Sequence, residues 1–110
     1  MIVKNLLGTS DEKCNCESWK EHYEKFSGHN PTFCIVIGCM NKVEVGAHVK
    51  KLDILMKPTG KALIMPFCKS CNAKSESLIV PDGVYEVSAD KSETCNKLDL
   101  RTIAFLSGLR

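Results

Sequence analysis

Apolar and polar residues recur along this chain with two different periods, and the first predicts a helix. Trp19, Tyr23 and Phe26 fall at helical spacing, behind a Ser-x-x-Glu capping box and in front of Gly28, a typical C-terminal stop. The pattern therefore predicts an amphipathic helix over residues 19 to 27. Its aromatic side chains are expected in the core.

The second period is that of strands. Residues 43 to 49 alternate, with valines and an alanine on one face and Glu44, Gly46 and His48 on the other. A second apolar strand is expected at residues 62 to 66. Together they predict a hairpin, followed by a helix from residue 68 or 69 to about residue 76.

Turn signals predict a further hairpin towards the C-terminus. Residues 77 to 80 and 84 to 87 are apolar and flank Pro-Asp-Gly, a sequence typical of a tight turn. The tail at residues 99 to 106 fits a helix or a strand. The prediction is one small α+β domain over residues 1 to 110, with an N-terminal helix, a central ββα unit and a second hairpin.

Two cysteine pairs at short spacing indicate a metal site in the centre of the chain. Cys34 and Cys39 enclose Gly38, whose backbone can take a positive φ and turn amide groups towards a thiolate. Cys68 and Cys71 are three residues apart, which places both sulfurs on one side of a helix start. Four thiolates are the ligands of a structural zinc, so we predict one zinc bound by all four cysteines.

The cysteine count favours metal binding over disulfides. The chain has seven cysteines, an odd number, and its first residues are too short an apolar stretch for a signal peptide. We therefore expect a soluble protein of the reducing cytoplasm, with no role in a membrane. A structural zinc with an apparent binding free energy of about 10–16 kcal/mol would rival the whole stability of so small a core.

Three cysteines remain once this site is filled. Cys14, Cys16 and Cys95 could bind a second zinc, with His48 or His22 as the nitrogen ligand. The alternatives are free, partly buried thiols or a thiol redox regulator.

Charge is concentrated in the central part of the chain, although the formal net charge of the whole is only +2. The window from residue 50 to residue 74 contains one acid, Asp53. Its six lysines are Lys50, Lys51, Lys57, Lys61, Lys69 and Lys74. Such a cluster is typical of a surface that contacts DNA or RNA, and equally of a solvated loop and helix face.

A zinc knuckle, a strand with Ala47-His48-Val49, a second strand and then Cys-x-x-Cys-Asn together resemble the HNH family, whose core is the treble-clef ββα-metal fold. The resemblance covers residues 33 to 76. It implies a structural zinc on the four cysteines and a separate divalent ion, Mg²⁺ or Mn²⁺, for cutting phosphodiesters. It also implies that His48 is the general base and Asn72 the last ligand of the catalytic ion.

The sequence departs from the family at two catalytic positions. Ala47 and Leu63 stand where the family has residues with polar side chains, and neither has a ligand atom. An ion held by Asn72, with Asp53 reaching in, would be weakly bound, which predicts an impaired nuclease. The expectation is thus a zinc protein that contacts nucleic acid, with or without cleavage; the alternatives are a module that binds another protein and the redox regulator.

Overall fold

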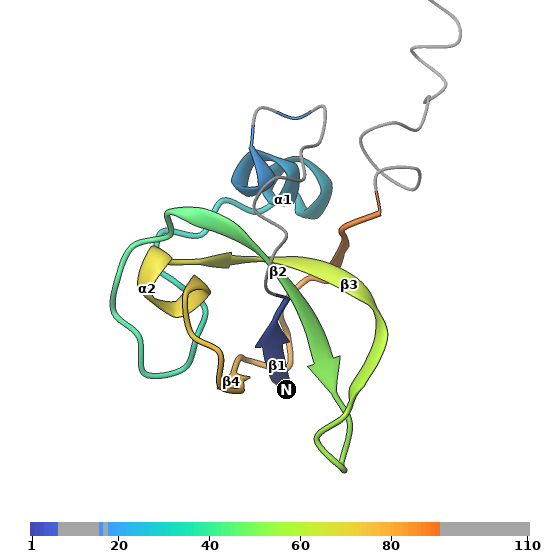
Figure 1. Ribbon diagram of the computed structural model, residues 1–110. Helices are drawn as coiled ribbons and strands as arrows, with labels where there is room; N and C mark the ends of the chain where they lie inside the picture. Colours follow the sequence, from blue (N-terminus) through green and yellow to red (C-terminus); the bar gives the residue numbers. More distant parts are fainter. Residues whose placement is uncertain (7–15, 17, 91–110) are drawn as a thin grey trace, which may run out of the picture.

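The computed structural model describes residues 1–6, 16 and 18–90, which form a small α+β domain around one antiparallel sheet (Figure 1). Its strands stand in the order β4-β1-β2-β3-β5. The elements are β1 (Ile2–Asn5), α1 (Trp19–Ser27), β2 (Val45–Leu52), β3 (Pro58–Phe67), α2 (Lys69–Asn72), β4 (Leu78–Ile79) and β5 (Val87–Ser88). Within these ranges, no helix is long and apolar enough to cross a membrane.

The helix predicted at residues 19 to 27 is confirmed as α1, and so are its caps. The Ser18 hydroxyl accepts a hydrogen bond from the Glu21 amide at 3.2 Å and donates one to the Glu21 carboxylate at 2.9 Å. Gly28 ends the helix in the left-handed conformation with φ of 72°. A helix this short depends on packing its apolar face, and α1 lies across β2 and β3 for that purpose.

The two faces of the sheet carry two separate cores. Alternation places Ile64 under α1, where it packs with Tyr23 and Val87, and with Trp19 and Phe26 at the edge. The opposite face packs against the cysteine loops. Its buried apolar residues include Val3, Ala47, Val49, Leu63, Met65 and Phe67. The predicted sharing of one face by alternate residues of the first strand is confirmed.

The central hairpin is longer than the sequence pattern indicated. β2 and β3 extend to residues 52 and 58, so only five residues remain as the turn, whereas the pattern predicted strands only at residues 43 to 49 and 62 to 66. The pairing shifts on the way: Val49 lies opposite Leu63, but Lys51 lies opposite Thr59. The extra residues of β3 form a bulge, which bends a strand and increases its twist. The outer end of the hairpin projects away from α1 (Figure 1).

The second hairpin expected at residues 77 to 87 is wrong. β4 pairs with β1 and β5 pairs with β3, so the two segments lie at opposite edges of the sheet. Pro-Asp-Gly does lie in a turn, but the chain then crosses to the other edge, because β1 and β3 each offer an unpaired side. The helix after Cys68 also ends early, at Asn72 instead of about residue 76. The tail at residues 99 to 106 lies outside the described residues.

Candidate metal centre

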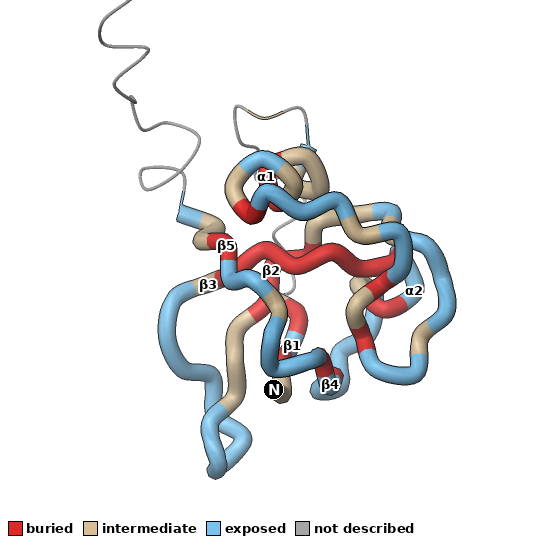
Figure 2. Tube along the Cα trace, turned by 180° about the vertical axis from the view of Figure 1, so that it is seen from behind, coloured by how far each residue is buried: buried red, intermediate tan, exposed pale blue. Residues whose placement is uncertain are grey.

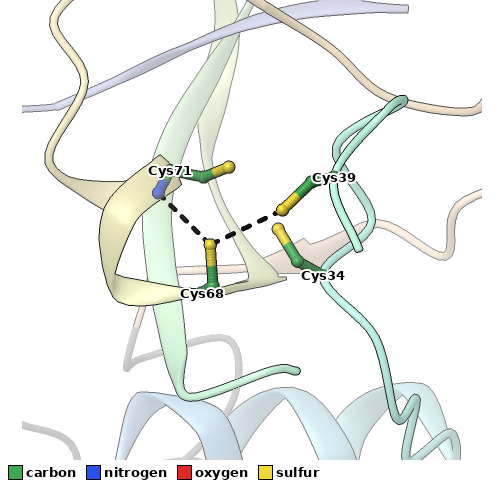
Figure 3. A group of neighbouring side chains, drawn as sticks. All are labelled: Cys34, Cys39, Cys68 and Cys71. Carbon is green, nitrogen blue, oxygen red and sulfur yellow. Dashed lines mark hydrogen bonds between the residues drawn. The ribbon is translucent and has the colours of Figure 1, made fainter. Parts of the chain in front are cut away.

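The four central cysteines converge at one point, as their spacing predicts (Figure 3). Their sulfur atoms all lie within 4.8 Å of one another. Cys34 and Cys39 come from the loop before β2, whereas Cys68 and Cys71 come from the start of α2, after β3. Each of the four is a free thiol. The group therefore joins two parts of the chain that the whole central hairpin separates in sequence.

The spacing of the sulfurs fits a tetrahedral metal ion. Cys39 Sγ and Cys68 Sγ are 3.7 Å apart. A tetrahedron with metal–sulfur bonds of about 2.3 Å has edges of about 3.8 Å, whereas a disulfide would need about 2.05 Å. Four sulfur donors in this shape suit zinc or iron and exclude the hard cations, which take oxygen ligands. The residues therefore could hold a metal ion.

Local backbone geometry aims the first pair of sulfurs. Gly38 has φ of 87°, so the left-handed conformation expected for it is confirmed. This conformation closes a tight turn in which the Cys39 amide donates to the Val36 carbonyl at 3.0 Å. A residue with a Cβ would be strained at this φ. Gly38 thereby brings Cys39 back towards Cys34.

The second pair uses a helix start. Cys68 is the N-cap of α2, and its sulfur accepts a hydrogen bond from the Cys71 amide at 3.3 Å. The Asn41 side-chain amide donates to the same sulfur at 3.6 Å. Burial by itself raises the pKa of Cys68, but these hydrogen bonds, together with those from the neighbouring thiols, lower the pKa to about 6. The centre therefore already favours one thiolate.

The thiols of Cys34 and Cys71 are more costly to ionise in the absence of a cation. Burial raises the pKa of Cys34 and of Cys71, and the neighbouring sulfurs raise the pKa of Cys71 further. Thiolates crowded together repel one another, and a bound metal ion removes this cost by supplying positive charge. The four thiols together could therefore hold a metal ion.

The N-terminal strand holds the second cysteine pair in place through hydrogen bonds from Asn5. The Asn5 side-chain amide, on β1, donates to the Cys71 carbonyl and to the Lys74 carbonyl, both at 2.9 Å. Cys71 lies in the last turn of α2 and Lys74 lies two residues after its end, so both carbonyls are at a place where the helix no longer supplies amide donors further along the chain. Nothing in the sequence pattern pointed to Asn5. Its role depends on the pairing of β1 with β2, which no local signal reveals.

The two histidines considered as ligands of a second zinc lie on the other face of the sheet. His48 is 6% exposed, and its ring meets that of Trp19 edge-on at 4.3 Å. His22, on α1, is 0% exposed. It lies on the aromatic stripe of α1, between Trp19 at 4.8 Å and Phe26 at 5.0 Å.

His22 has a polar anchor inside this aromatic cluster. Its Nε2 lies 2.9 Å from the Ser88 carbonyl, which can only accept, so Nε2 carries the proton. Burial, the largest influence, lowers the pKa of His22; the Ser88 carbonyl raises it, and nearby Lys25 lowers it. Neutral His22 therefore fixes β5 to α1. Of the cysteines considered with it, Cys16 is half-buried, and Cys14 and Cys95 lie outside the described residues.

The proposed catalytic residues belong to different sides of the sheet. His48 packs under α1, whereas Asn72 belongs to α2, whose cysteines pack on the face of Ala47 and Leu63. Ala47 and Leu63 are 1% and 4% exposed and form part of the core around the cysteines. Among the described residues, His48 and Asn72 thus come from separate packing layers.

The six central lysines fall into two groups. Lys50, Lys51, Lys57 and Lys61 belong to the hairpin of β2 and β3. The other two, Lys69 and Lys74, lie in and just after α2. Lys51 forms an ion pair with Glu86 at 2.7 Å.

A seventh lysine, to which the charge pattern of residues 50 to 74 did not point, lies beside the first group. Lys4 of β1 lies directly opposite Lys50 of β2. Neither makes an ion pair with a described residue, and like charges in opposed positions of two strands destabilise a sheet.

The candidate site of this domain is therefore a four-cysteine metal centre on one face of the sheet, with a lysine-bearing hairpin extending from it. The centre is built from residues on both sides of that hairpin, and β1 holds it in place through Asn5. Comparison of the chain with protein-family models, with curated proteins and with solved structures gives no match.

Proposed function

We propose that this chain is a zinc-stabilised, HNH-like domain that binds nucleic acid and does not cleave it efficiently. The order of its parts supports the likeness. A cysteine knuckle with a left-handed glycine leads into a β-hairpin, and a Cys-x-x-Cys helix start follows. The same order underlies the treble-clef core, although α2 has only four residues.

Zinc is the metal that this centre suits best. A closed set of four thiolates leaves no position for water or substrate, which is typical of structural zinc sites. The centre packs directly on the core of Ala47, Val49 and Phe67. Loss of the ion would leave three buried thiols and the half-buried thiol of Cys39 in the place of a cross-link, so the metal is expected to hold the fold.

The paired lysines of β1 and β2 carry the proposal of nucleic-acid binding. Lys4 and Lys50 are held opposite each other by strand pairing, and such a pair gains most from an anion placed between the two ammonium groups. Lys57 and Lys61 add positive charge along the same hairpin. A phosphate backbone offers anions at regular spacing, and neutralising them releases counterions.

Three residues argue against efficient cleavage. Ala47 and Leu63 are buried apolar residues of the core and offer no ligand atom to a catalytic ion. The His48 ring is enclosed by Trp19 and is 6% exposed, so a water molecule activated by it would need α1 to move. Binding without turnover is therefore the function that we favour.

Salt-dependent binding tests the proposal. Binding of a short DNA duplex and of single-stranded RNA is measured by fluorescence anisotropy between about 50 and 200 mM salt, where several phosphate contacts cost a large loss of affinity. Replacing Lys4 and Lys50 by glutamine should weaken binding and reduce the slope of log affinity against log salt by about 2. A charge-matched control replaces Lys25 and Lys42 and should keep the slope of the parent. Affinity that ignores salt, or equal slopes for both variants, contradicts the proposal.

Plasmid nicking with added Mg²⁺ or Mn²⁺ tests the absence of cleavage. We expect no difference between the parent and His48→Ala. Nicking that disappears in His48→Ala would identify a nuclease instead.

A further inference from the structure

The end of the β2–β3 hairpin carries an unusual group of side chains. Ile54, Leu55 and Met56 follow one another in the turn and are 96%, 71% and 48% exposed. Figure 2 shows the whole end of the hairpin as exposed, beyond the buried parts of both strands. Exposed apolar residues in isolation are ordinary, but three in succession at a projecting tip are not. We call Ile54, Leu55 and Met56 the apolar tip.

The turn that presents the apolar tip is closely fixed. The Asp53 carboxylate accepts hydrogen bonds from the Leu55 amide at 2.9 Å and from the Lys57 amide at 3.0 Å. The Asp53 amide donates to the Lys57 carbonyl, and the Met56 amide donates to the Asp53 carbonyl, each at 2.8 Å. Backbone groups are thus satisfied within the turn, and the apolar side chains are left to point outwards.

The backbone conformation of Met56 also indicates that the apolar tip does more than connect two strands. It has φ of 61° and is the only residue other than glycine with a positive φ among those that the structure describes. Glycine or asparagine would fit this position at lower cost. A strained conformation occupied by an exposed apolar side chain is a reason to look for a function of that side chain.

Positive charge surrounds the tip on both strands. Lys57 is next to Met56, and Lys61 and Lys50 follow further back. Strand geometry, about 3.3 Å per residue, puts Lys50 about 13 Å behind Ile54. The single acid of this segment, Asp53, has its carboxylate engaged by the turn. The hairpin therefore combines an apolar end with a cationic shaft.

From this combination we infer that the apolar tip inserts between base pairs of duplex DNA from the minor groove, while the lysines of the shaft contact the flanking phosphates. The inference rests on the proposed binding of nucleic acid and names its mode. Isoleucine, leucine and methionine are among the side chains that wedge between base steps, and such wedges kink the duplex by about 20–90°. The two rows of phosphates beside a groove suit lysines on both strands of a hairpin.

A bilayer with anionic lipids is the competing surface, since an apolar tip with lysines behind it could enter headgroups as well. The pair of Lys4 and Lys50 favours DNA. These lysines lie on neighbouring strands behind the tip, and so continue the positive charge along the shaft. A hairpin can contact the two sides of a DNA groove along its length, whereas a flat membrane surface contacts only the end of the hairpin.

The test measures binding and bending separately. A short DNA duplex with a central TA step, which kinks easily, carries a donor and an acceptor dye at its ends. The zinc-loaded parent should bind and raise the energy transfer between the dyes. The double variant Ile54→Ser, Leu55→Ser should lose this rise but keep the salt dependence of the parent. Ile79→Ser is the control, because Ile79 is 55% exposed on another strand, and it should bend DNA as the parent does.

The outcomes separate the inference from the proposed function. Salt-dependent binding by the parent without a change in energy transfer overturns the wedge and leaves the proposed function in place. Absence of DNA binding by the parent overturns both. Equal loss of bending in Ile79→Ser and in the tip variant overturns the role of the tip. Co-sedimentation with phosphatidylserine vesicles that needs Ile54 and Leu55, without DNA bending, assigns the tip to a membrane surface and overturns the inference.

Discussion

The backbone of Trp19 lies directly over Gly46, so that a Cβ atom added to Gly46 would be 2.3 Å from the carbonyl carbon and from the carbonyl oxygen of Trp19. The start of α1 can approach β2 this closely only because residue 46 has no side chain. The contact also sets the position of the Trp19 ring over His48. It thereby holds the helix in place against the sheet.

Gly46→Ala should therefore destabilise the domain by about 1–3 kcal/mol, the usual range for overpacking a core. The clash is with backbone atoms, which cannot rotate away as a side chain would. Urea denaturation of the metal-loaded protein measures the change. Gly83→Ala is the matched control, because a Cβ at Gly83 meets nothing within 4 Å and φ is not positive there. A Gly46→Ala variant as stable as the Gly83→Ala variant would refute the close approach.

Removal of the metal should abolish cooperative unfolding. A metal ion held by the four thiols would cross-link the loop before β2 to the loop after β3, and structural zinc contributes an apparent ~10–16 kcal/mol at neutral pH. We expect native mass spectrometry to find one metal ion per chain in the parent and none in Cys68→Ser, and we expect a chelator to remove the thermal transition of the parent. A parent that melts alike with and without chelator would show that the metal is not structural.

Asn5→Ala should lower the free energy of unfolding by about 1–3 kcal/mol, since it removes the two hydrogen bonds to the carbonyls of Cys71 and Lys74, the first of which is buried. Because these carbonyls belong to the loop of Cys71, metal should also dissociate faster into a chelating dye. Lys4→Ala, the neighbouring exposed position of β1, serves as the control for both readings. Equal metal release from the two variants would contradict the role of Asn5.

Met56→Gly should stabilise the domain by about 0.5–1 kcal/mol. Relief of a left-handed conformation is worth about 1–2 kcal/mol for a residue with a Cβ, and the entropy of glycine in the unfolded chain offsets part of it. Met56→Ala keeps a Cβ and should gain nothing. Chemical denaturation of the parent and the two variants measures their free energies of unfolding. An increase in the alanine variant equal to that in the glycine variant would argue against backbone strain.

Stability should decrease as the pH falls below about 6.5. Burial lowers the pKa of His22 in the folded state below its ordinary value of 6.5. The unfolded chain therefore takes up a proton that the folded chain does not, and unfolding becomes easier. His22→Gln should weaken this dependence. Metal content must be followed at each pH, because protonation of the thiolates also releases the ion.

Local signals predicted the helix α1 and the convergence of the four cysteines. The capping serine, the aromatic spacing and the glycine stop all act within one helix, and each cysteine pair acts within one turn. Gly38 could be predicted because a tight knuckle requires its conformation. These parts depend on neighbours in sequence.

Other parts depend on partners far away in the chain. β1 finds β2 more than forty residues later, and β4 and β5 exist only as short pairings with the free sides of β1 and β3. Apolar runs around Pro-Asp-Gly therefore suggested a hairpin that tertiary pairing overrode. His22 did carry a signal: it lies three residues after Trp19 and four before Phe26, on the stripe that α1 buries.

The position of β1 has a consequence for the order of assembly. Among the strands that the structure describes, Ile2–Asn5 is synthesised first, yet in the finished sheet it lies between β2 and β4, which are made much later. During translation β1 remains unpaired until its neighbouring strands have been made, whereas the hairpin of β2 and β3 can close from local contacts alone. Insertion of β1 is then a late step, and a ribosome stalled before residue 78 would hold a sheet in which β1 can pair with β2 but not yet with β4.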